Sequence, residues 1–219
     1  NITKIKTVGL IPVRLNSNRL YRKAILEIDG IPMFVHTYKR SLISKKLRDV
    51  FVCTDSQKII NIAKKFNCKY IKTGSNITGT DRISEAAKKI KQKYDLYIDI
   101  QGDEPLLDPN HIDKVIDWHL NNLDFDIVVP SLKSNIIDSP HIVKIVKSKK
   151  KVLYFSRSLV PYPFKKKQKY IHKHLSIISF RPDSLKKFKL LKQGMLEKIE
   201  GIELMRALEN NMNIGTFNL

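Results

Sequence analysis

The sequence contains little of what small proteins use as covalent or metal reinforcement. Its 219 residues include two cysteines, Cys53 and Cys68, and no Cys-x-x-Cys pair, which excludes a disulfide framework, a zinc ribbon and a thioredoxin-type site. No apolar run approaches the roughly 18 residues of a membrane span, and the opening segment lacks the apolar core of a secretory signal. We therefore expect a soluble protein in the reducing cytoplasm, without a membrane partner.

Glycine is also scarce, and the familiar glycine-rich motifs are missing. With only 8 glycines, the chain contains no GxGxxG, no GxxxxGK[ST] and no GxSxG. These absences remove the main support for a dinucleotide-dependent dehydrogenase, a P-loop enzyme and an α/β-hydrolase. The hydrophobic content of 42% excludes a disordered chain, and a chain of this length buries roughly 70% of its unfolded surface in one core.

Acidic residues are outnumbered: 21 Asp and Glu stand against 41 Lys and Arg, for a formal net charge of +20. A nucleic-acid-binding protein is one interpretation of that charge. The basic residues are mostly lysine and widely spread, however, and neither a zinc-finger spacing nor an RNP-like aromatic strand accompanies them. We expect a solvated lysine-rich surface and no nucleic-acid partner, with a field that attracts small anionic substrates.

Apolar segments alternate with amphipathic ones over about the first 130 residues. The patterns predict strands at 5–12, 49–53, 68–71, 94–100 and 125–129. They predict helices at 31–47, after Ser56, from Thr80 and at 109–119. This order is typical of a doubly wound, mostly parallel α/β sheet with right-handed crossovers.

The pattern changes after residue 130. Segments 142–146, 152–155 and 175–180 resemble strands without long helices between them, which predicts an antiparallel insert at about 131–181 with an exposed loop at 163–173. Helices at 182–191 and 195–209 and a strand at 213–217 complete a single domain over 1–219.

Two polar segments follow buried strands, at the sheet edge where open parallel sheets bind ligands. After the first strand, Ser17 and a set of cations form a basic loop that could hold a triphosphate; the cations are Arg14, Arg19, Arg22 and Lys23. Each cation near a phosphate oxygen contributes up to about 4 kcal/mol at an effective dielectric near 20. After the fourth strand, Asp103 follows Gly102, where a carboxylate can hold Mg2+ against phosphates. A solvated loop and a turn-capping Asp are the structural alternatives; together the segments predict a metal-bound nucleoside triphosphate.

Several short motifs occur in a fixed order along nearly the whole chain. They are IPVR (11–14), GIPMFVH (30–36), CTD (53–55), TGTDR (78–82), DIQGDEP (99–105), VKIV (143–146), LYFSR (153–157), KHLSIISFR (173–181) and the acidic segment 196–209. With these motifs the chain resembles the CMP-Kdo synthetases, the 3-deoxy-D-manno-octulosonate cytidylyltransferases, which couple CTP to an eight-carbon sugar acid. The resemblance implies a nucleotide-diphospho-sugar transferase type of fold, a homodimer, Mg2+ as cofactor and a role in lipopolysaccharide or capsule synthesis.

The resemblance also implies roles for particular residues. The nucleotide-binding residues would be Arg14, Ser17, Arg19, Lys23, Thr80, Arg82 and Gln101. The catalytic residues would be Lys23, Asp103 and Arg19, with Asp103 as the metal ligand. The sugar-acid pocket would be lined by Gln101, Arg157, His174, Glu197 and Glu200, and the antiparallel insert would supply this pocket and the dimer contacts. The reaction would be in-line attack of the anomeric hydroxyl on the α-phosphorus, expelling pyrophosphate, with no general base evident.

The chain also departs from the family pattern. Tyr21-Arg22 stands where the family has Pro-Gly, Ser176 stands for a glycine and Leu204 for a glutamine. The family carries a second acidic metal ligand beyond the last strand, and this sequence ends at Leu219, before that position. Two alternatives stay open: a related nucleotidyltransferase for another sugar acid, such as an amino-Kdo, and a non-catalytic basic protein that retains the fold.

Overall fold

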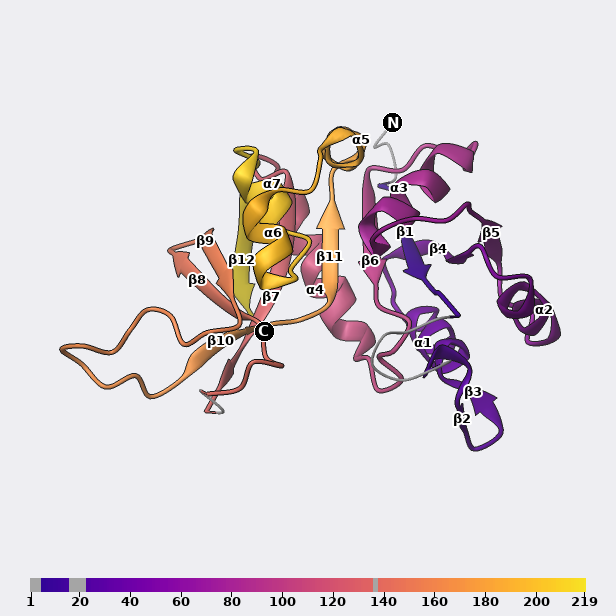
Figure 1. Cartoon of the computed structure of the whole chain (residues 1–219). Helices are drawn as coiled ribbons and strands as arrows, with labels where there is room; N and C mark the ends of the chain where they lie inside the picture. Colours follow the sequence, from indigo (N-terminus) through magenta and orange to yellow (C-terminus); the bar gives the residue numbers. More distant parts are fainter. Residues whose placement is uncertain (1–4, 16–22, 136–137) are drawn as a thin grey trace.

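The computed structural model describes residues 5–15, 23–135 and 138–219 (Figure 1). The described residues form a ten-stranded mixed sheet in the order β10-β8-β9-β12-β7-β11-β6-β1-β4-β5, and a small two-stranded sheet of β2 (Glu27–Ile28) and β3 (Ile31–Pro32). Ser17 and Arg19 lie outside the described residues, as does the Tyr21-Arg22 departure. No helix in the described part of the chain is long and apolar enough to cross a membrane.

The N-terminal half contains the expected parallel strands. These are β1 (Thr7–Pro12), β4 (Leu47–Thr54), β5 (Tyr70–Lys72) and β6 (Leu96–Ile100). Strand β1 pairs in parallel with both β4 and β6, so the carboxyl ends of β1 and β6 lie at one edge of the sheet. This arrangement brings the two polar segments that follow β1 and β6 to the same edge.

The connecting helices begin within two residues of their predicted starts. The helices are α1 (Met33–Ser41), α2 (Gln57–Lys65), α3 (Gly79–Lys89) and α4 (Pro109–Leu120), with a 3-10 turn, η1 (Lys23–Ile25), ahead of them. Ser56, Thr78 and Asp108 each accept a hydrogen bond from a backbone N–H of the first turn. The helix predicted over 31–47 ends at Ser41, because Leu47 already pairs with Thr7 as the first residue of β4.

The C-terminal half contains strands that are mostly antiparallel to their neighbours. They are β7 (Ile127–Ser134), β8 (Lys144–Ser148), β9 (Lys151–Ser156), β10 (Ile171–His174), β11 (Ile177–Phe180) and β12 (Ile214–Asn218), of which β7 and β12 pair in parallel. Strand β11 lies in the middle of the sheet, antiparallel to β6 and β7, and so joins the two halves. The single strand predicted over 175–180 is therefore β11 alone, and residues 171–173, predicted as loop, belong to β10.

Two clusters of buried side chains cover the two faces of the sheet. In β7, Ile127 and Val129 belong to one cluster and Val128 to the other, as the alternation of a strand requires. Helices α3, α5 (Pro182–Leu190) and α7 (Met205–Glu209) contribute to the first cluster, whereas α1, α2 and α4 contribute to the second. Figure 1 shows α6 and α7 beside each other over the C-terminal half.

The helix predicted over 195–209 is two short helices, α6 (Met195–Glu200) and α7. Gly201 ends α6 in the left-handed conformation at φ +63°, which glycine adopts without the strain of a side chain. The break sends residues 201–204 toward the edge of the sheet where the polar segments lie.

Candidate functional site

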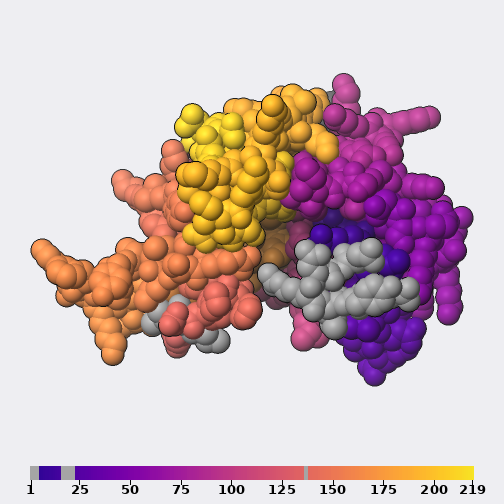
Figure 2. All heavy atoms as spheres, viewed as in Figure 1, coloured from indigo at the N-terminus to yellow at the C-terminus, as the bar shows by residue number. Residues whose placement is uncertain are grey.

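A cavity of about 890 Å3 lies at the carboxyl ends of β1 and β6. One wall comes from residues 12–14, 76–79, 82, 101, 103 and 104, and the other from residues 141–143, 157, 173–176, 178, 193, 197 and 201–204. Figure 2 shows these two parts of the chain as an indigo-to-magenta half and an orange-to-yellow half. The cavity therefore lies where the sequence places its ligand, at the junction of the parallel half with the antiparallel half.

The two polar segments meet at Lys23 and Asp103. Lys23 Nζ lies 2.7 Å from Asp103 Oδ2, and both side chains are partly exposed, at 38% and 46%. An exposed ion pair of this kind contributes less than about 1 kcal/mol to stability, so it holds neither segment rigidly. Arg14 is exposed and lines the cavity together with Asp103, so a cationic and an acidic group face the same space.

The donor set around Asp103 can be compared with what a magnesium ion requires. Within the described ranges no group of three or more His, Cys, Asp or Glu side chains is arranged to hold a metal ion. Mg2+ is commonly held by one or two carboxylates while substrate phosphates and water supply the other ligands. The exposed carboxylate of Asp103 in the cavity matches that donor set. A neighbouring carboxyl, Glu104, has its pKa raised by burial and by Asp103.

Arg82 and Thr80 belong to the first turns of α3, beside the wall of the cavity that carries Arg14 and Asp103. Arg82 lines the cavity and is fixed from behind: its Nη1 donates to Thr73 Oγ1 at 2.7 Å and lies 3.2 Å from Asp55 Oδ1. Thr80 is fully buried and is not one of the lining residues; its backbone N–H donates to Glu203 Oε2 at 3.3 Å. Arg82 is thus placed to contact a ligand directly, while Thr80 lies beneath the cavity.

Arg157 lines the opposite wall and is held mainly by backbone carbonyls. Its Nε donates to Glu200 O at 2.7 Å, Nη1 to Pro140 O at 3.0 Å and Nη2 to Gly201 O at 3.2 Å. A guanidinium has five N–H groups, so two remain for a ligand. Glu200 is not one of the lining residues, and its carboxylate accepts hydrogen bonds from Ser156 Oγ and from the Arg157 backbone N–H. Glu200 therefore lies behind Arg157 and supports it, instead of lining the pocket as predicted.

His174 lies on β10 and faces the cavity as a neutral imidazole. Burial lowers its pKa to about 4, so the ring carries no charge near neutral pH. The ring also packs edge-to-face on Phe155, with 5.6 Å between centroids. Beside a cationic Arg157, the site thus offers one charged and one uncharged group toward an incoming carboxylate or hydroxyl.

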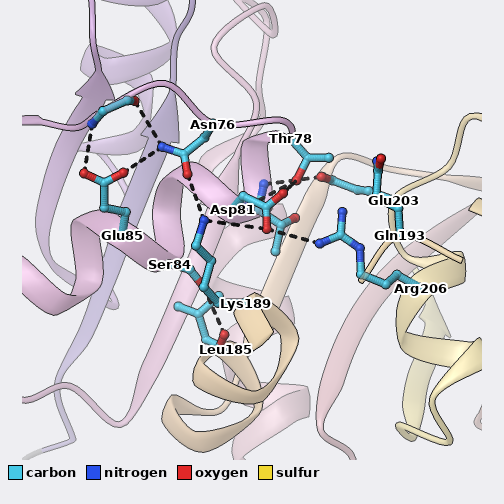
Figure 3. Close-up of polar contacts among 12 residues, drawn as sticks. Asn76, Thr78, Asp81, Ser84, Glu85, Leu185, Lys189, Gln193, Glu203 and Arg206 are labelled. Atoms are coloured by element: carbon cyan, nitrogen blue, oxygen red, sulfur yellow. Dashed lines mark hydrogen bonds and ion pairs between the residues drawn. The ribbon is translucent and has the colours of Figure 1, made fainter. Parts of the chain in front are cut away.

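Glu197 lines the cavity but is already ion-paired. Its Oε2 and Oε1 accept hydrogen bonds from Arg206 Nε and Nη2 at 2.8 and 2.7 Å, and Arg206 Nη1 donates to Asp81 Oδ1 at 3.1 Å. Figure 3 shows Arg206 reaching from α7 toward Asp81 at the start of α3. These ion pairs raise the pKa of Arg206 and span the two walls of the cavity. This buried ion pair between α7 and α3 links the two walls, and sequence patterns did not indicate it.

Two further acidic residues at the base of the cavity were not predicted as site residues. Asp99 is the one charged residue of the buried strand β6, and Glu203 lines the cavity in the turn before α7. The signal for Asp99 is visible in the sequence, since an Asp interrupts an otherwise apolar LYIDI segment. For Glu203 no such signal exists, because acidic residues are frequent in 196–209.

Comparisons with known proteins identify the family and the fold of this chain. Residues 8–214 match the family model described as cytidylyltransferase, and the chain belongs to that family of nucleotidyltransferases. Among curated relatives, the 3-deoxy-manno-octulosonate cytidylyltransferase of Chloroherpeton thalassium is 38% identical over 218 residues, covering 96% of this chain and 88% of that protein. That of Rickettsia prowazekii is 40% identical over 213 residues, covering 94% and 84%. The resemblance to the CMP-Kdo synthetases is thereby confirmed.

Solved structures support the same assignment of fold. A CMP:2-keto-3-deoxy-manno-octonic acid synthetase complexed with CTP has a TM-score of 0.91 and 32% sequence identity, covering 98% of this chain and 90% of that chain. A cytidylyltransferase from Leptospira borgpetersenii has a TM-score of 0.65 and 20% identity, covering 98% and 76%, and shows the fold alone. The predicted α/β nucleotidyltransferase architecture is confirmed.

Proposed function

We propose that this protein transfers the cytidylyl group of CTP to Kdo, giving CMP-Kdo and pyrophosphate. The observation that carries the proposal is the composition of the cavity described above. Its wall from β1 and β6 presents Arg14 and the Lys23–Asp103 pair, and its opposite wall presents Arg157 and His174. A triphosphate suits the first wall, and the carboxylate of a sugar acid suits the second.

The chemistry follows from this separation of charges. Arg14 and Lys23 would neutralise phosphate oxygens, and Asp103 would hold Mg2+, which supplies charge neutralisation at the phosphates when it is bound. The anomeric hydroxyl of the sugar attacks the α-phosphorus in line with the departing pyrophosphate. Positioning of the two substrates on facing walls supplies much of the rate acceleration, because a bimolecular encounter becomes intramolecular.

Arg157 is the group that would orient the sugar acid. Its two free N–H groups match the two oxygens of a carboxylate. Gln101, which also lines the cavity, would accept or donate to sugar hydroxyls beside the nucleotide. The departures from the family pattern lie here: Ser176 and Leu204 both line this cavity. They favour keeping one alternative, a related sugar acid such as an amino-Kdo, in the substrate panel.

We further propose a homodimer in the cytoplasm whose product feeds lipopolysaccharide or capsule synthesis. The exposed aromatic side chains of the loop after β9, Tyr162 at 77% and Phe164 at 84% exposure, support an intermolecular contact through the antiparallel region. Burial of such side chains against a second copy is favourable by about 25 cal/mol per Å2 of apolar surface.

The test is pyrophosphate release with CTP, Kdo and Mg2+, compared with ATP, GTP and UTP and with other sugar acids including an amino-Kdo. The test variant is Asp103→Ala. The control variant is Asp183→Asn, at a carboxylate on α5 that is 86% exposed. Turnover with CTP and Kdo that Asp103→Ala abolishes and Asp183→Asn preserves supports the proposal. Turnover with another sugar acid alone favours the alternative. No turnover together with salt-dependent RNA binding favours the non-catalytic protein.

A further inference from the structure

Asp99 is a buried carboxyl group in the centre of the sheet. It lies on β6, is 0% exposed, and is flanked in register by Leu10 on β1 and Ile178 on β11. Within the described ranges no Lys, Arg or His forms an ion pair with it. An isolated ionised carboxylate in such surroundings is costly, because apolar neighbours replace its hydration. An apolar Leu or Val at position 99 would avoid this cost, so the carboxyl group of Asp99 needs a role that only a polar side chain can fulfil there.

The hydrogen bond of Asp99 indicates that role. Its Oδ1 accepts from Gln101 Nε2 at 3.1 Å, while Oδ2 is buried without a partner in the described structure. Residues 99 and 101 are two apart in an extended segment, so both side chains point to the face of the sheet that carries α3 and α7. Gln101 lines the cavity, whereas Asp99 lies beneath it.

We propose that Asp99 is a positioning residue that anchors the amide nitrogen of Gln101 and thereby turns the Gln101 side-chain oxygen toward the substrates. Without this anchor the amide group rotates, and its nitrogen and oxygen exchange places with respect to a sugar hydroxyl. The inference rests on the proposed function, because it assigns the orientation of a residue at the sugar-nucleotide boundary of that same site.

The charges around Asp99 favour its neutral form. Burial raises the pKa of Asp99 well above its usual value, and the nearby Glu203 carboxylate raises it further. Glu203 in turn has a raised pKa because of burial and the negative charge of Asp81. On the other elements, Cys53 of β4 and Arg82 of α3 are the facing titratable groups, and the pKa of the Cys53 thiol is raised by burial and by Asp99. A proton on Oδ2 leaves Oδ1 free to accept from Gln101.

The test is a double-mutant cycle of Asp99→Leu and Gln101→Ala, with Asp99→Asn as the conservative variant. We expect Asp99→Leu to lower kcat/KM for the sugar acid about tenfold or more, with CTP affinity retained, and Asp99→Asn to stay within about threefold of the parent enzyme. In the Gln101→Ala background, Asp99→Leu should cost little more. Additive losses, or an Asn variant as impaired as the Leu variant, would overturn the inference. If the Leu variant does not fold, Asp99→Ala takes its place in the same cycle.

A second measurement separates this inference from the proposed function. In an NMR spectrum of the 15N-labelled protein, the Gln101 side-chain amide should give one shifted pair of resonances that persists in Asp99→Asn and reverts in Asp99→Leu. Persistence in both variants contradicts the anchor. If the parent protein releases no pyrophosphate from CTP and Kdo, the proposed function fails, while this spectrum still decides whether Asp99 holds the Gln101 amide.

The pH dependence of stability gives an independent outcome. A carboxyl whose pKa is higher in the folded than in the unfolded chain makes stability fall as the pH rises from about 4 through the folded pKa. Asp99→Asn replaces the titrating carboxyl group with an amide that does not titrate. The free energy of unfolding of this variant should therefore fall less steeply with rising pH than that of the parent protein. Identical slopes would show that Asp99 is ionised and contradict its neutral form.

Discussion

Lys23 Nζ lies 2.7 Å from Asp103 Oδ2, and 80 residues of chain separate the two groups. The lysine ends the basic loop after β1, and the aspartate lies three residues after Ile100, the last residue of β6. Their contact places the predicted cationic and metal-binding segments face to face. Because the pair is exposed and weak, an entering magnesium–nucleotide can compete for both partners. Before substrate binds, the charges of Lys23 and Asp103 therefore neutralise each other.

Lys23→Ala should weaken the use of CTP without unfolding the protein. The loss of one phosphate-binding cation should lower kcat/KM for CTP about tenfold or more. The free energy of unfolding should change by less than about 1 kcal/mol, because the side chain is exposed. Steady-state kinetics and urea unfolding measure both. Lys58→Ala, an exposed lysine on α2, is the matched control. Kinetics equal to those of the control would contradict a role for Lys23.

Arg157→Ala should mainly raise the KM for the sugar acid and leave that for CTP little changed. Arg157 offers its two free N–H groups to a carboxylate, whereas its other three donate to carbonyl oxygens. Glu200→Gln should give the same kind of defect to a smaller degree, since Glu200 supports Arg157 through its backbone N–H. Exposed Arg48→Ala serves as the control. A defect in CTP use alone would move Arg157 away from the sugar.

Arg206→Met should destabilise the protein by about 3–5 kcal/mol, because it leaves Glu197 buried without a cation and leaves Asp81 with only its longer ion pair to Lys189, at 3.9 Å. The side chain is 2% exposed and lies 4.7 Å from the Phe188 ring centroid, so methionine retains much of the apolar packing. Equilibrium urea unfolding gives the difference. The combined Arg206→Met and Glu197→Gln variant should recover part of the loss, and no recovery would show that packing outweighs the ion pair.

His119 should make stability depend on mildly acidic pH. It is fully buried between Ser179 Oγ at 2.7 Å and the Phe125 carbonyl at 3.0 Å, and burial lowers its pKa to about 4. Because the unfolded chain binds the proton more tightly, stability is lost as the pH falls from about 6.5 to about 4. This single group accounts for up to about 3 kcal/mol over that window. His119→Gln should flatten the dependence measured by urea unfolding; an unchanged slope would show that other groups cause it.

Sequence patterns located much of the fold and the two polar segments at its binding edge. The order of strands and helices, the cap at Ser56, and the strand ends before Arg14 and Gln101 were predicted from local features, because propensity and periodicity are local properties. The motifs with which the chain resembles the CMP-Kdo synthetases were likewise visible, and the family is confirmed. The break at Gly201 was missed, because the periodicity on either side continues across it.

Only the tertiary structure decided which side chains act as pairs. Arg206 and Asp81 are 125 residues apart, and nothing local indicates that they meet. The same holds for Glu200, which its motif placed in the pocket and its backbone contacts place behind Arg157. Asp99 shows the division most clearly: the sequence by itself determined that an acid interrupts a buried strand, whereas the neighbouring Glu203 and Gln101 determined its charge and its role. Burial and long-range contacts set the electrostatics of a carboxyl group, and neither is a property of the residue's sequence neighbours.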